Sequence, residues 1–348
     1  MTQHFAVILL LLVLALILAS LAFWLYTRQR FLSLPLSRRV TPSGGMFGKF
    51  NPRNIVTFLY ARWPEFFLGF IIRWIFPIVD ETTKQWMRDH YHGKVLTQEL
   101  AEAIITINQF VPLQDLEQII PYATARDIVL NVPLDIVVYE CTCRRSRPVH
   151  CEPTQVCMII GQPFADFTLQ HNPEKSRRLS TTEALELLRA EHERGHIHAA
   201  YFKEDHLNRF YVICNCCKCC CGGIEAMVKY NNPIIAPSGY IACPDEGLCI
   251  SCGACVDACA FGALSLVNTA VVAWEKCLGC GVCTAFCPQE AIALVRDERK
   301  GVPLDVRLLP KTGAGQKQPA PGEPQPVPLG GRGSHAVIGR QTNTALDE

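Results

Sequence analysis

The fold is decided by two stretches, CISCGACVDAC at residues 249–259 and CLGCGVCTAFCP at residues 277–288. Each has the spacing C-x2-C-x2-C-x3-C, and the second follows the first after 28 residues. This spacing lets three thiolates bind three corners of one cubane cluster, while the fourth reaches a second cluster. The predicted ligands are Cys249, Cys252, Cys255, Cys259, Cys277, Cys280, Cys283 and Cys287. Zinc ribbons also use C-x2-C pairs, but their pairs lie farther apart, so we predict two [4Fe–4S] clusters.

Residues 240–297 resemble bacterial two-cluster ferredoxins, including the flanks ISCGAC at 250–255 and LGCGVC at 278–283. The resemblance implies a small α+β unit with a pseudo-twofold repeat, with strands such as Leu264–Val267 and Ala291–Val295. It also implies crossed ligation. One cluster would be held by Cys249, Cys252, Cys255 and Cys287, and the other by Cys259, Cys277, Cys280 and Cys283. Ala260 departs from the family pattern, which has proline there, so the loop of Cys259 is expected to be less rigid.

Ten further cysteines precede this region, at positions Cys141, Cys143, Cys151, Cys157, Cys214, Cys216, Cys217, Cys219, Cys220 and Cys221. In an extended segment, cysteines two residues apart point to the same face, which favours a shared metal. Six thiols within residues 214–221 exceed the needs of one tetrahedral ion, so we predict a third iron–sulfur cluster among these residues. Zinc, unligated thiols and a redox-active thiol pair stay open as alternatives. The block resembles a region ahead of the ferredoxin module in 4Fe–4S binding proteins of anaerobic bacteria.

Charged residues lie between these cysteines. Arg144, Arg145, Arg147 and Lys218 would offset the charge of thiolate-bound iron, and the alternative is an ordinary solvated basic patch. Cys243 is expected to be a small buried residue on the first strand of the ferredoxin module. Three histidines, His192, His196 and His198, are expected to be solvated at the end of a surface helix.

The N-terminus is strongly apolar. Residues 5–26 contain no charge, which predicts a transmembrane helix, with a signal peptide as the alternative. Arg28, Arg30, Arg38 and Arg39 follow it, so the positive-inside rule predicts a single-pass protein of the cytoplasmic membrane, with its N-terminus outside and its iron–sulfur domains in the cytoplasm. Thiols stay reduced there, which argues against disulfides. The apolar, aromatic-rich stretch at residues 55–79 predicts a helix lying in the membrane interface, with a core helix as the alternative.

Local signals divide the rest of the chain. Thr97 is predicted to cap the start of one helix, and Pro112 to start a second. Residues 180–183 are predicted to form a capping box ahead of a third helix, which Gly195 ends. Strands are predicted at 135–139 and 210–213. The predicted fold class is α+β, in five parts: a transmembrane anchor at 1–27, an interfacial segment at 28–95, a mixed α/β cysteine-rich middle domain at 96–235, the ferredoxin module at 236–300 and a disordered Pro/Gly-rich tail at 301–348.

Function classes can be excluded from composition and motifs. The net charge of +1, from 33 basic and 32 acidic residues, argues against nucleic acid as a partner. The sequence has no dinucleotide-binding or P-loop motif. We therefore expect a carrier that exchanges electrons with redox partner proteins at the membrane. A redox-enzyme subunit with its catalytic centre in the middle domain, and a redox or iron sensor, are the alternatives.

Overall fold

The computed structural model describes residues 10–21, 23, 63–107, 111–113, 128–130, 134–203 and 209–308. The helices are α4 (Pro64–Phe70), the π-helix η2 (Ile71–Ile75), α5 (Glu81–His90), α6 (Gln98–Ile105), α7 (Thr142–Arg145), α8 (Phe164–His171), α9 (Thr181–Glu193), α10 (Gly222–Val228), α11 (Ala254–Ala258), α12 (Val282–Ala285) and the 3-10 helix η4 (Glu298–Lys300). The strands are β1 (Tyr91–Leu96), β2 (Val111–Leu113), β3 (Ile128–Leu130), β4 (Ile136–Glu140), β5 (Gln155–Ile160), β6 (Ser176–Leu179), β7 (Ile197–Lys203), β8 (Arg209–Cys216), β9 (Ile235–Ala236), β10 (Tyr240–Pro244), β11 (Leu264–Val267), β12 (Thr269–Val272) and β13 (Ile292–Arg296).

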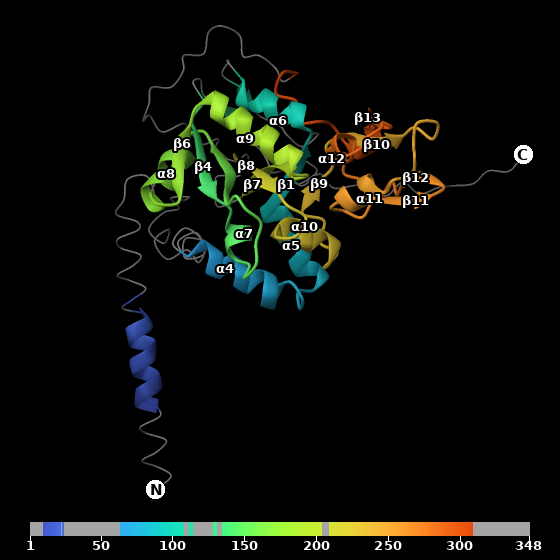
Figure 1. Cartoon of the computed structure of the whole chain (residues 1–348). Helices are drawn as coiled ribbons and strands as arrows, with labels where there is room; N and C mark the ends of the chain where they lie inside the picture. Colours follow the sequence, from blue (N-terminus) through green and yellow to red (C-terminus); the bar gives the residue numbers. More distant parts are fainter. Residues whose placement is uncertain are drawn as a thin grey trace, which may run out of the picture. The chain divides into compact units, whose positions relative to one another are not determined.

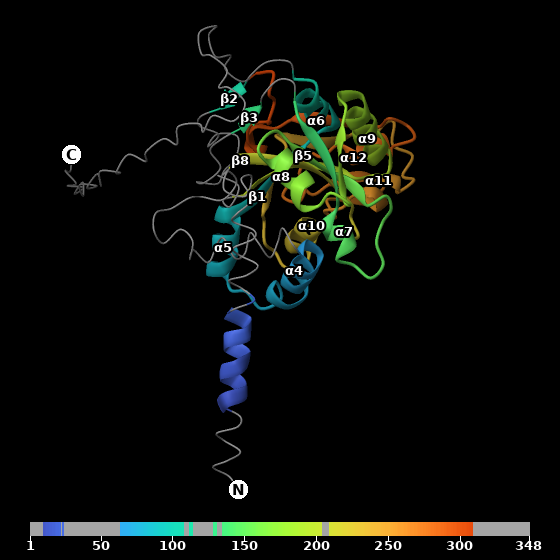
Figure 2. The ribbon, with the colours of Figure 1, turned by 90° about the vertical axis from the view of Figure 1, so that its left-hand side faces the viewer.

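A seven-stranded sheet is the centre of the middle domain among the described residues, with strand order β6-β4-β5-β8-β7-β1-β9. Neighbouring strands are antiparallel, except that β1 and β9 are parallel. Helices α6 and α9 lie side by side on one face of the sheet, and α4 and α10 lie toward the other (Figures 1 and 2). The sheet therefore has a hydrophobic layer on each side.

Alternating side chains of the strands supply these two layers. Ile136 and Val138 of β4 belong to the layer under α6 and α9, whereas Val137 between them belongs to the opposite layer. The opposite layer also contains Ile72 of η2 and Ile224 of α10. It is this second layer that contains most of the buried cysteines of the middle domain.

Helix-capping signals in the sequence are confirmed. The Thr97 hydroxyl accepts the N–H of Leu100 at the start of α6, and Ser180 and Glu183 form the capping box of α9. Gly195, with φ +80°, follows the end of α9. The predicted helix starting at Pro112 is wrong at its beginning, because Val111–Leu113 pairs with β3 as a strand; residues 114–127 lie outside the described residues.

The predicted fold class is wrong in its membrane part. No helix in the described part of the chain is long and apolar enough to cross a membrane. The described residues form a mixed α/β fold, and the prediction of a single-pass membrane protein with its N-terminus outside is corrected accordingly.

The aromatic segment predicted to be helical over residues 55–79 is helical from Pro64 to Ile75, and residues 55–62 lie outside the described part. Ile72 and Phe76 are buried in the layer beneath the sheet, as a core helix requires. Phe66 and Trp74, on the other edge of the same helical segment, are exposed.

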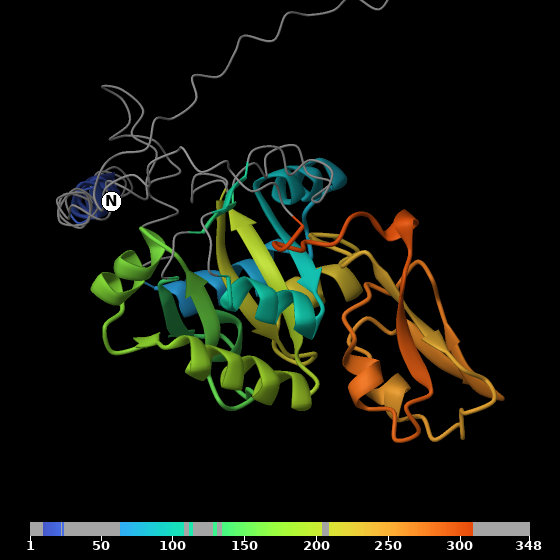
Figure 3. The same cartoon turned by 90° about the horizontal axis from the view of Figure 1, so that it is seen from above.

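The ferredoxin module consists of two similar halves (Figure 3, orange). Strand β10 pairs with β13, and β11 pairs with β12, all antiparallel. Helices α11 and α12 each follow a left-handed glycine, Gly253 (φ +81°) and Gly281 (φ +84°), which lie 28 residues apart like the cysteine motifs. The predicted repeat and its strand at 264–267 are confirmed, and the strand predicted at 291–295 is present one residue later, as β13.

The chain continues in contact with the middle domain after the module. Leu304 and Val306 are buried in the layer under α6 and α9, and Arg307 pairs with Glu99 at 2.7 Å. The described residues therefore extend past the predicted boundary at residue 300. The predicted disordered tail lies, from residue 309 on, outside the described residues.

Candidate metal centres

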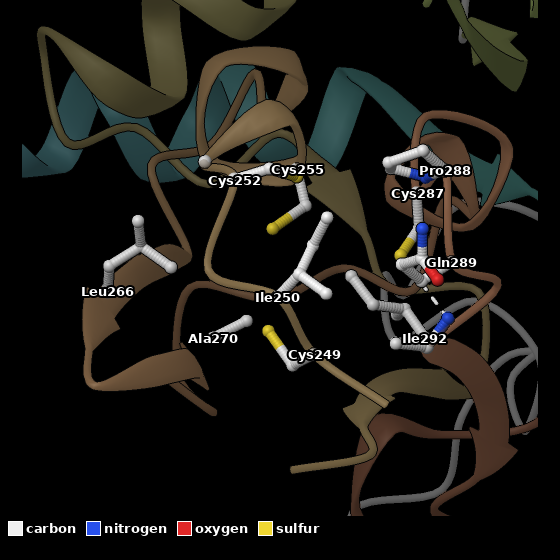
Figure 4. A pocket seen from close by; sticks show the side chains of 12 residues that line it. Cys249, Ile250, Cys252, Cys255, Leu266, Ala270, Cys287, Pro288, Gln289 and Ile292 are labelled. Atoms are coloured by element: carbon white, nitrogen blue, oxygen red, sulfur yellow. Dashed lines mark hydrogen bonds between the residues drawn. The ribbon is translucent and has the colours of Figure 1, made fainter. Parts of the chain in front are cut away.

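Two cavities in the ferredoxin module are each lined by four cysteines. The first, called site I, contains Cys249, Cys252, Cys255 and Cys287. The second, called site II, contains Cys259, Cys277, Cys280 and Cys283. Figure 4 shows the sulfurs of Cys249, Cys255 and Cys287 around the side chain of Ile250 in site I. Each site takes three cysteines from one motif and the fourth from the other, which coincides with the grouping that the ferredoxin resemblance implies.

The donor sets of both sites fit thiolate-bound iron. The N–H of Ala263 donates to the Cys259 sulfur at 3.2 Å, and the N–H of Ala291 donates to the Cys287 sulfur at 3.2 Å. Backbone N–H groups of Ala270 and Ser251 lower the pKa of Cys249. Such N–H···S bonds stabilise negative charge on the sulfurs, which is one way in which proteins set cluster potentials.

The two sites differ in burial. At site I the Cys252 side chain is exposed. At site II burial raises the pKa of Cys280 to about 12 and raises that of Cys283 as well. Thiols with raised pKa values must lose protons to bind metal, so metal binding at site II is coupled to proton release.

Gly279 allows the loop of site II to approach the start of β10. Its φ is +65°, and a β-carbon there would lie 2.1 Å from the carbonyl oxygen of Tyr240. We expect Gly279→Ala to destabilise the module by more than the roughly 1–3 kcal/mol of backbone strain alone, because the clash is with main-chain atoms. Thermal unfolding and iron content of the purified chain measure this effect.

Gly262 provides the matched control, because its φ of +60° is similar but no atom lies within 4 Å of the added β-carbon. Gly262→Ala should cost only the strain of a left-handed alanine, about 1–2 kcal/mol, and should keep its iron. Equal losses in the two variants would contradict the steric explanation.

Six cysteines of the middle domain form a closed ring of thiol contacts beneath the sheet. Side-chain interactions that shift the thiol pKa values connect neighbours in the order Cys141, Cys143, Cys221, Cys216, Cys214 and Cys157, and Cys157 is connected back to Cys141. We call this set the six-thiol ring. It is assembled from the start of α7, the neighbouring strands β5 and β8, and the start of α10.

The two cysteine pairs reach the ring in different ways. Cys214 and Cys216 lie on β8 two residues apart, as predicted for an extended segment. Cys141 and Cys143 do not lie in an extended segment, because β4 ends at Glu140 and the helix α7 begins at Thr142. Gly222, next to the ring, has no room for a β-carbon, since Ile72 would lie at 2.7 Å.

The ring is electrostatically unusual. Five of its thiols have pKa values raised well above the ordinary value, whereas hydrogen bonds from Cys214 and Cys221 lower the pKa of Cys216 to about 7. Several buried thiolates without a counter-charge would be costly. A bound metal would supply that charge.

The other predicted ligands and Cys243 lie elsewhere. Cys151, Cys217, Cys219 and Cys220 form a separate group with sulfurs within 4.8 Å of one another. Cys243 is on β10, but it is exposed, which corrects the prediction that it is buried.

Arg144 is the residue whose role the sequence indicated only in part. It is fully buried, with one nitrogen 2.8 Å from Glu191, and it contacts His196 at 3.1 Å and the carbonyl of Asn215 at 3.2 Å. Burial would raise the pKa of Glu191, but hydrogen bonds from His196 and Arg144 outweigh burial and lower it. Arg145, by contrast, is about half exposed. The solvated-patch alternative therefore fails for Arg144, and also for Arg147, whose side chain is only 23% exposed and pairs with Glu225.

The histidine prediction is wrong. His192, His196 and His198 are all buried, and His198 lies on β7, where it contacts Asn215 at 2.6 Å. Sequence reasoning missed Glu191 and Asn215 altogether. Glu191 follows the polar pattern of a surface helix, and no local signal distinguishes it.

The fold and the cysteine sets define an iron–sulfur protein with a ferredoxin-type domain. Residues 248–291 match the family model described as a 4Fe-4S dicluster domain. No curated protein and no solved structure matches the chain. Together with the many cysteines, the family match supports an iron–sulfur electron-transfer protein.

Proposed function

We propose that this protein transfers single electrons between partner proteins, with one [4Fe–4S] cluster at site I, a second at site II and a third iron–sulfur cluster on the six-thiol ring. The observation that carries the proposal is the crossed grouping of eight cysteines around two cavities. When bound, such clusters take up and release one electron at a time.

The residues around the sites support this use. Backbone N–H groups hold Cys259 and Cys287 in equivalent positions in the two halves. Exposed Cys252 leaves one side of site I open to a partner protein. In the six-thiol ring, four of the six cysteines are buried beneath the sheet and Cys143 and Cys214 are half-buried, so little water reaches the sulfurs. Six thiols are also more than the four that one cubane requires.

Metal analysis of the full chain, purified without oxygen, tests the proposal. We expect about twelve irons and about twelve acid-labile sulfides per chain, together with reversible one-electron reduction followed by EPR. Cys157→Ala combined with Cys214→Ala should lower both contents to about eight, because it removes two neighbouring thiols of the ring. Cys243→Ala, at an exposed cysteine, is the control and should change nothing.

About eight irons and eight sulfides per unaltered chain would remove the third cluster from the proposal. Little iron, or no reversible reduction, would contradict the whole of it. Turnover of a substrate by the purified chain would favour the redox-enzyme alternative.

A further inference from the structure

Four cysteines outside the six-thiol ring gather at the surface of the middle domain. Cys151 lies in the loop after α7, and Cys217, Cys219 and Cys220 lie in the turn between β8 and α10. The sulfur of Cys151 is 2.7 Å from that of Cys219 and 3.9 Å from that of Cys220, and the last two are 3.4 Å apart. All four sulfurs lie within 4.8 Å of one another.

The separations of 3.4 and 3.9 Å are close to those of ligands that share one ion, and the 2.7 Å contact between Cys151 and Cys219 would lengthen by about 1 Å on binding. A tetrahedral ion with metal–sulfur bonds of about 2.3 Å holds its four sulfurs about 3.8 Å apart. The thiolates of a cubane bind four different irons and therefore stand farther apart. We propose that Cys151, Cys217, Cys219 and Cys220 bind a single divalent, thiophilic metal ion, zinc or ferrous iron, at a tetrahedral site distinct from every cluster.

The surroundings suit such a centre. Four thiolates around a divalent ion carry a net charge of −2. Buried Arg144 interacts electrostatically with Cys217, and Arg147 donates to the carbonyl oxygen of Cys220 at 3.2 Å. Both arginines also pair with carboxylates, Arg144 with Glu191 and Arg147 with Glu225, so they offset only part of the charge of the thiolates.

The position of the site indicates what the ion does for the chain. Cys217 and Cys220 are directly adjacent to Cys216 and Cys221, which belong to the six-thiol ring. An ion bound to Cys151 as well would connect this turn to the loop after α7, far away in the sequence. Lys218 in the same turn donates to the carbonyl oxygen of Asp257 at 3.0 Å.

Comparing metal with sulfide in the full chain tests the proposal separately from the cluster count. Iron and sulfide are equal in [4Fe–4S] clusters, so the site should appear as about one zinc per chain, or as about one iron in excess of sulfide. Cys151→Ser should remove that one equivalent and leave the sulfide content unchanged. Cys219→Ser, at an exposed cysteine, should do the same if Cys151→Ser folds poorly, and Cys243→Ser is the control.

Several results would overturn the proposal. A fall in sulfide of about four per chain in Cys151→Ser would make these thiols cluster ligands. The proposal would also be overturned if the chain held no zinc and no iron in excess of its sulfide. So would a disulfide between Cys151 and Cys219, found by mass spectrometry of the anaerobically purified chain. Zinc as the bound ion indicates a purely structural site, whereas iron indicates a redox-active one, and X-ray absorption should give four sulfur neighbours in either case.

Discussion

Replacing Arg144 with alanine is expected to remove a large part of the stability of the middle domain. Its guanidinium and the Glu191 carboxylate are both fully buried and 2.8 Å apart. Removing the arginine leaves the carboxylate with His196 at 2.7 Å and the partly exposed Arg194 at 2.9 Å as its partners. Breaking a buried pair costs about 3–5 kcal/mol, and the remaining pair with Arg194 places the expected loss toward the lower end of that range. A typical domain is stable by only about 5–15 kcal/mol.

Urea unfolding of the full chain measures this loss, and Arg145→Ala is its matched control. The neighbouring Arg145 is 44% exposed and lies 3.7 Å from Glu140, so its loss should cost less than about 1 kcal/mol. Arg144→Met combined with Glu191→Leu should be less destabilising than Arg144→Ala, since no charge is then left unpaired. Similar losses in the Arg144 and Arg145 variants would show that the buried pair is not what stabilises the domain.

The features predicted correctly from the sequence are those that nearby residues determine. The four-cysteine motifs, with Gly253 and Gly281 inside them, specify a loop followed by a short helix whatever surrounds them. Ser180 and Glu183 satisfy each other's hydrogen bonds within one turn of helix. Such signals need no knowledge of tertiary structure.

The division of the middle cysteines into two sets could not be predicted. It depends on β5 lying beside β8, which brings Cys157 to Cys214, and on α7 starting early enough to turn Cys143 toward Cys221. Strand order is a property of the whole sheet. Spacing alone therefore indicated metal binding, but not that ten thiols would form a ring of six and a group of four.

The buried polar residues escaped prediction for the same reason. Glu191 lies in the last turn of α9 and His196 in the connection after it, where the sequence looks like a surface. Only the packing of α9 against the sheet places them beside Arg144. The apolar run at the N-terminus predicts a membrane span from its length and composition alone, and that prediction is wrong, because no helix in the described ranges is long and apolar enough for one.

Two double variants are expected to distinguish crossed from uncrossed ligation by the amount of iron they lose. Cys249 and Cys287 come from different motifs but line the same cavity, site I. Cys249→Ala combined with Cys287→Ala should therefore remove one cluster, about four irons and four sulfides per chain. Cys249 and Cys259 come from the same motif but line different cavities, so replacing both with alanine should remove about eight of each.

Both variants lose two thiols from the ferredoxin module, so each serves as the control for the other, and Cys243→Ala shows the effect of changing a cysteine outside the sites. Site II contains neither Cys249 nor Cys287, which is why the first variant should keep its four irons there. Uncrossed ligation predicts the reverse: the pair from one motif would lose about four irons, and the pair from different motifs about eight. Because the two arrangements exchange the losses, general damage to the module, which would lower iron equally in both variants, cannot imitate the expected result.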